Sequence, residues 1–115
     1  MRELKADSDE FEEAFTMSNI RPKHTGLPMV IWVSPKTGKE KHGPRIKAQT
    51  THGDKAQMGN WVTVTVEENP QVIGEGLDTG DTEAVKAFVK RNKETLLKLW
   101  SDELDPLDLP KFLKQ

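Results

Sequence analysis

Side chains suited to acid–base chemistry on a phosphate are concentrated between positions 21 and 55 of this chain. This stretch holds eight of the 17 Lys and Arg residues, all three His and only two acids. Cleavage of a phosphodiester needs a proton donor and acceptor that titrate near neutral pH, and a cation for the developing charge. His42 or His52 together with Arg45 or Lys47 has the required groups. Among them, we take His42 and Arg45 as the catalytic candidates.

The same residues also form a plausible binding surface without catalysis. If the segments 44–50 and 61–66 are paired strands, alternation places Arg45 and Lys47 on one face with Trp61. Cations that hold phosphate beside an exposed indole are typical of sheets that bind single-stranded nucleic acid. The predicted residues for binding nucleic acid or another partner are Lys36, Lys39, Lys41, His42, Arg45, Lys47 and Trp61.

A plainer interpretation of this face needs no ligand. Lys and Arg often keep an edge strand from pairing with other chains, and Trp61 then packs beneath the N-terminal segment. Both interpretations stay open at the level of the sequence.

Metal and cofactor sites are not indicated by the sequence. The three His are 18 and 10 residues apart, which matches no compact ligand pattern, and the chain has no Cys. The segment GKEKHG lacks the spacing of a phosphate-binding loop, and GEGLDTGD lacks the carboxylate spacing of a calcium loop. We therefore expect no metal and no cofactor.

The middle of the chain has the pattern of β-strands. PMVIWV (28–33) is a short apolar run typical of a buried strand, and PRIKAQT (44–50) alternates. WVTVTV (61–66) is the clearest strand, with three Val on one side and Trp61 on the other. QVIG (71–74) has the pattern of a short fourth strand.

An amphipathic helix is predicted at about 82–101. Its apolar residues recur at spacings of three, four and seven, and Asp81 or Thr82 is the expected cap. Asp105-Pro106 stops it, and the tail should fold back and bury its apolar residues: Leu104, Leu107, Leu109 and Phe112. The predicted fold is α+β, with a three- or four-stranded antiparallel sheet and one main C-terminal helix packed on one face. The predicted core comprises Val30, Ile31 or Trp32, Val62, Val64, Val66, Val85, Phe88, Val89, Leu96 and Leu99.

Bulk composition predicts a single small domain. The chain has 115 residues and a net charge of −2, with 34% hydrophobic residues. Residues 1–16 form an acidic segment, either disordered or a short helix, and residues 17–115 form the α+β domain. The segment lacks the apolar core of a secretory signal, and no apolar run approaches the roughly 20 residues of a membrane span. We expect a cytoplasmic protein that does not associate with membranes.

Two segments resemble a family of small uncharacterised bacterial domains. These are HGPRIKAQTTHGDKAQ, with the strand that follows it, and VKAFVKRNKETLLKLW; together the likeness covers roughly residues 28–101. Genes of that family often lie beside other small genes, in arrangements like those of toxin–antitoxin pairs. The family motif usually has two His around Pro, whereas this chain has only His42 before Pro44, with Arg45 following it. The resemblance implies the strand–strand–helix order.

The functional prediction is a small non-enzymatic binding module that uses a basic sheet face to engage nucleic acid or an acidic protein. One alternative is a toxin-type ribonuclease that uses His42 and Arg45. Another is a protein that binds a second small protein and has no role with nucleic acid.

Overall fold

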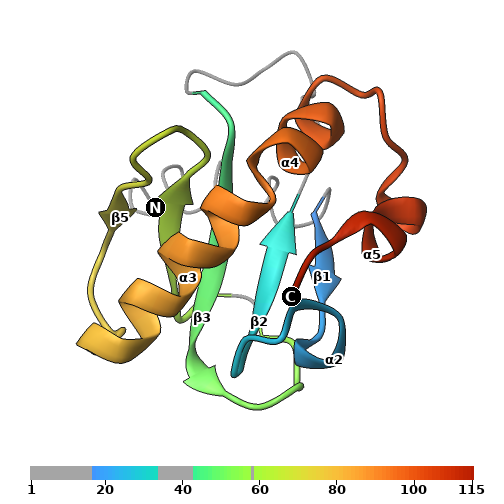
Figure 1. Ribbon diagram of the computed structural model, residues 1–115. Coiled ribbons are helices and arrows are strands. Elements are labelled where there is room, and N and C mark those ends of the chain that lie inside the picture. Colours follow the sequence, from blue (N-terminus) through green and yellow to red (C-terminus); the bar gives the residue numbers. More distant parts are fainter. Residues whose placement is uncertain (1–16, 34–42, 58) are drawn as a thin grey trace, which may run out of the picture.

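The computed structural model describes residues 17–33, 43–57 and 59–115. Its centre is a five-stranded antiparallel sheet in which each strand pairs with the next along the chain (Figure 1). The strands are β1 (Ser18–Ile20), β2 (Met29–Val33), β3 (Arg45–His52), β4 (Trp61–Thr65) and β5 (Val72–Ile73). The helices are α2 (Pro22–Thr25), α3 (Thr79–Arg91), α4 (Lys93–Trp100), the 3₁₀ turn η1 (Pro106–Asp108) and α5 (Leu109–Phe112).

The predicted α+β class and the antiparallel sheet are confirmed, but the strand count is not. The described residues form five strands instead of three or four, because Ser18–Ile20 adds β1 at one edge. With three residues and only Ile20 buried among them, β1 is too short to show a pattern in the sequence. Its place is determined by pairing with β2, which no local signal reveals.

The hydrophobic core lies between the sheet and the helices α3 and α4. Alternation sends Ile46 and Ala48 of β3 to this side, together with Val62 and Val64 of β4. All of the predicted core residues are buried. However, Val30 and Trp32 face away from the helices, because Ile31 between them points into the core cluster. None of the helices in the described part of the chain has the length and apolar character to cross a membrane.

The predicted helix at 82–101 is two helices joined at Asn92. The apolar stripe runs through Val85, Val89, Leu96 and Leu99, and Asn92 occupies the position on that stripe where an apolar residue would stand. Asn92 is buried, and its amide donates to the carbonyls of Phe88 and Lys114 at 3.0 and 2.9 Å. Its Oδ1 accepts from the backbone N–H of Lys114 at 2.7 Å. Asn92 thus lies between the two helices and holds the C-terminal tail against them through its hydrogen bonds with Lys114.

The start of α3 and the tail also differ from the predictions. Asp78, rather than Asp81 or Thr82, caps α3, because its Oδ1 accepts from the N–H of Asp81 at 2.7 Å. The tail does fold back and bury Leu109, and Leu104 is partly buried. Leu107 and Phe112 are exposed, because the short η1 and α5 turns point them away from the core.

Replacement of Asn92 by Ala should destabilise the fold and release the tail. It leaves the partly buried N–H and C=O of Lys114 without their Asn92 partner, and an unmade buried hydrogen bond costs about 1–3 kcal/mol. We expect the free energy of unfolding in urea to fall by about that amount, with faster amide exchange at Lys114. The matched control is Asn69→Ala in an exposed turn; equal losses in the two variants would contradict the role of Asn92.

The turn between β4 and β5 is tied to α4 by an ion pair. Lys93 Nζ lies 2.8 Å from Glu68 Oε1, and this hydrogen bond and charge hold the pKa of Glu68 below its ordinary value of 4.5. Because folding lowers the pKa of Glu68, the ion pair stabilises the fold at pH values above the ordinary pKa of Glu68. This stabilisation is lost as the pH falls through the pKa of Glu68 in the folded protein.

Lys93→Met should therefore raise the pKa of Glu68 toward its ordinary value. The shift is measured by an NMR pH titration of the Glu68 carboxyl carbon. Lys98→Met is the control, since Lys98 pairs with Glu94 and not with Glu68. A Glu68 titration that is the same in wild type and Lys93→Met would refute this assignment.

Candidate functional site

The residues singled out on β3 and β4 do share one face of the sheet. The register pairs Arg45 with Thr65, Lys47 with Thr63, and Gln49 with Trp61, and directly paired residues lie on the same side. Trp32 of β2 pairs with Lys47 and joins them. We call this side, opposite the helices, the second face.

The second face is not the exposed basic surface that the sequence predicts. Lys47 is only 3% exposed and Gln49 only 1%, while Arg45 and Trp61 are half-buried. The expectation of an exposed Lys47 is therefore wrong. Alternation determines which face a residue occupies, but it does not determine whether that face is covered.

Gln49 is the centre of a hydrogen-bond network on the second face. Its Oε1 accepts from Trp32 Nε1 at 2.8 Å and from the backbone N–H of Gln57 at 2.7 Å. Its Nε2 donates to the carbonyl of Lys55 at 3.1 Å. The side chain therefore ties the loop after β3 to the sheet, and its polar atoms are satisfied within the fold.

The indole of Trp61 is engaged from two sides. Trp32 meets it edge to face, with ring centroids 5.5 Å apart and an interplanar angle of 67°. Lys47 Nζ lies over the ring, 5.2 Å from its centroid, and donates to Thr63 Oγ1 at 3.4 Å. An ammonium group over a Trp ring is a favourable cation–π arrangement. That ring face is occupied, which leaves less of the indole for stacking a base.

An open groove of about 310 Å³ lies at the end of the second face where β3 begins. The groove combines one cation, hydroxyl groups, one carboxylate and an apolar side chain, Ile73, which is 59% exposed. Its described lining is Gly43, Pro44, Arg45, Thr63, Thr65, Val66, Glu67 and Ile73.

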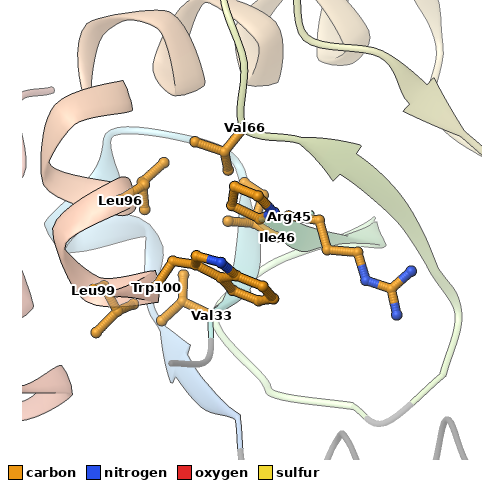
Figure 2. Close-up of a pocket in the computed structure, with 8 residues that line it drawn as sticks. Val33, Arg45, Ile46, Val66, Leu96, Leu99 and Trp100 are labelled. Carbon is orange, nitrogen blue, oxygen red and sulfur yellow. The ribbon is translucent and has the colours of Figure 1, made fainter. Parts of the chain in front are cut away.

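A second pocket beside it is part of the packed core. Its volume is only about 10 Å³, which is room for about one water molecule. Figure 2 shows Trp100 of α4 packed toward Val33 and Ile46, whereas the guanidinium of Arg45 points away from them. Arg45 thus lines this small pocket, and its guanidinium points away from it.

The structure does not bring His52 and Arg45 together. They stand at opposite ends of β3, so seven residue-to-residue steps along the strand separate them by roughly 23 Å. His52 Nε2 instead lies 2.7 Å from Asp81 Oδ2. A carboxylate beside His52 repels a phosphodiester. Four predicted binding residues, Lys36, Lys39, Lys41 and His42, lie outside the described residues.

Three basic residues outside the predicted binding set line a separate cleft. Arg21, Lys23 and His24 border about 290 Å³ of open space together with Asn19, Ile20 and Pro110. The available signal was the density of basic residues in RPKH. The RPKH segment has no strand alternation, so the sequence gives no reason to expect these three side chains to face the same space.

Comparison of the chain with models of protein families, with curated proteins and with solved structures finds no match. The resemblance to small bacterial domains therefore stays a prediction, and function has to be argued from the geometry above.

Gln49→Ala should destabilise the protein strongly. It removes the acceptor of two donors, Trp32 Nε1 and the Gln57 N–H, and each buried unsatisfied group costs about 1–3 kcal/mol. Urea unfolding followed by Trp fluorescence should show a loss of about 2 kcal/mol or more. Gln71→Ala, at an exposed site, should cost little; a Gln49 variant as stable as that control would mean that the network is not needed.

Proposed function

We propose that this protein is a small non-enzymatic binding module that engages an acidic segment of a protein partner. The observation that carries the proposal is the open groove at the start of β3, where Arg45 stands beside hydroxyl groups and the exposed Ile73. A cytoplasmic location and a setting among toxin–antitoxin-like genes belong to this proposal as predictions.

The groove has the chemistry needed to hold a peptide with an acidic residue. A guanidinium binds a carboxylate through two parallel hydrogen bonds. Thr63 Oγ1 accepts from Lys47, so its own proton remains available for a ligand oxygen. Ile73 offers apolar area to a neighbouring side chain. The predicted contacts from Lys36, Lys39, Lys41 and His42 would add positive charge just before this point in the sequence.

A protein partner is favoured over nucleic acid by three features of the second face. Lys47 is buried, so it cannot contact a backbone phosphate. One side of the Trp61 indole is occupied by the Lys47 ammonium group. The groove also contains Glu67, whose carboxylate repels a polyanion more strongly than a peptide in which apolar residues separate the acidic ones.

The ribonuclease alternative receives less support from the same geometry. His52 is paired with Asp81 at the far end of β3 from Arg45. His42, the other candidate, lies outside the described residues.

Arg45→Gln should weaken binding of an acidic peptide about tenfold, which is about 1.4 kcal/mol. The probe is a fluorescein-labelled peptide of Glu and Leu residues, followed by fluorescence anisotropy at low salt. Ile73→Ser should also weaken binding, by removing the apolar contact. Arg91→Gln, at an exposed position on α3, is the matched control and should bind as wild type does.

A single-stranded 12-mer DNA serves as the competing probe. Nucleic-acid binding weakens steeply with salt, because neutralised phosphates release counterions. If the 12-mer binds more tightly than the peptide and with such a slope, the proposal of a protein partner is wrong. Unchanged peptide binding by a folded Arg45→Gln protein would equally overturn it.

A further inference from the structure

The cleft lined by Arg21, Lys23 and His24 lies at the other end of the sheet from the groove at Arg45. Figure 1 shows α2 close to the C-terminal tail and at the end of the sheet where β3 ends, whereas β3 begins at the opposite end. A hydrogen bond from the Gly53 N–H to the Pro28 carbonyl, at 2.9 Å, joins the loop after α2 to the end of β3. The cleft is thus a separate site, and it does not depend on the function proposed above.

The backbone that carries the three side chains is held on both sides. Ile20 before it and Thr25 after it are both buried. Thr25 Oγ1 accepts from the Leu27 N–H at 3.0 Å, and the His24 N–H donates to the Arg21 carbonyl at 2.9 Å. The turn is therefore fixed before any ligand arrives, which lowers the entropy cost of binding.

The opposite wall is anchored as well. Pro110 of α5 belongs to it, and the tail beyond it is fastened to Asn92 through Lys114. Gln115 Nε2 also donates to the carbonyl of Lys23 at 3.0 Å. Both walls of the cleft thus connect to the core of the fold.

The charge of the cleft is uncompensated among the described residues. None of the described side chains that line it is acidic. Arg21 and Lys23 are exposed, and neither takes part in the ion pairs found in the described part of the chain. Two permanent cations and an imidazole therefore face the same open space, an arrangement that attracts a compact anion of high charge.

We propose that this cleft binds the phosphate group of a phosphorylated small molecule. A guanidinium offers a fork of donors that matches phosphate oxygens, the Lys ammonium adds a point charge, and the imidazole adds a further nitrogen. The volume of about 290 Å³ is at the lower end of small-molecule sites, which begin at about 300 Å³. It suits a phosphomonoester with a small carrier group.

The test is an NMR titration of ¹⁵N-labelled protein with inorganic phosphate and then phenyl phosphate, at constant ionic strength with sodium chloride. We expect saturable shifts of the amide signals of residues 19–21 and of Lys23 and His24, with phenyl phosphate binding more tightly. The double variant Arg21→Gln/Lys23→Gln should lose at least tenfold in affinity, and Arg21→Lys should lie between it and wild type. Lys90→Gln/Arg91→Gln, which removes two exposed cations of α3, is the matched control and should bind as wild type does.

Several outcomes would overturn the proposal. They are shifts that do not saturate, shifts that chloride alone reproduces, and equal affinities in the Arg21/Lys23 and Lys90/Arg91 variants. Tight, salt-sensitive binding of a single-stranded 12-mer at these residues without binding of phenyl phosphate would assign the cleft to a nucleic-acid backbone instead. Arg45→Gln should leave phosphate binding at the cleft unchanged. A failure of the phosphate-binding proposal can therefore be distinguished from a failure of the peptide-binding proposal.

Discussion

Both faces of β3 are buried along its middle, from Ile46 to Gln49, and this constraint governs what these four residues can do. Ile46 and Ala48 pack under the helices, which needs only apolar surface. Lys47 and Gln49 are equally buried on the second face, where polar groups are costly unless they are hydrogen-bonded. Gln49 meets that requirement with three hydrogen bonds, and Lys47 interacts with Trp61 and Thr63. The second face is therefore a structural layer of the protein.

The sequence predicts the positions of the central strands and of the C-terminal helical stretch well, because both depend on local periodicity. Alternation in 44–50 and 61–66 also places Arg45, Lys47 and Trp61 on one face, as the register confirms. Burial of that face is a property of what packs on it. Such contacts come from residues distant in sequence, so the pattern that located Lys47 could not reveal its burial.

The errors in the fold prediction have similar causes. β1 has three residues, too few for a period, and exists through its pairing with β2. The sequence does contain a signal for the division of the long helix at Asn92, because this polar residue interrupts an apolar stripe. The sequence does not predict the hydrogen-bond partner that allows Asn92 to be buried. That partner is the backbone of Lys114, 22 residues further along the chain. Local patterns locate elements, and tertiary hydrogen bonds determine where those elements end.

The burial of Lys47 also bears on the two binding sites proposed above. A long polyanion needs cations that follow its backbone in a continuous row. Among the described residues of the basic stretch, Arg45 lines the groove at one end of the sheet, and Arg21 and Lys23 line the cleft at the other. β3 alone separates these ends by roughly 23 Å, well beyond the Debye length of about 8 Å at physiological salt. The two sites therefore act as independent, local charges. That separation is consistent with the two compact anionic groups proposed above, a carboxylate and a phosphomonoester, which do not need a continuous row of cations.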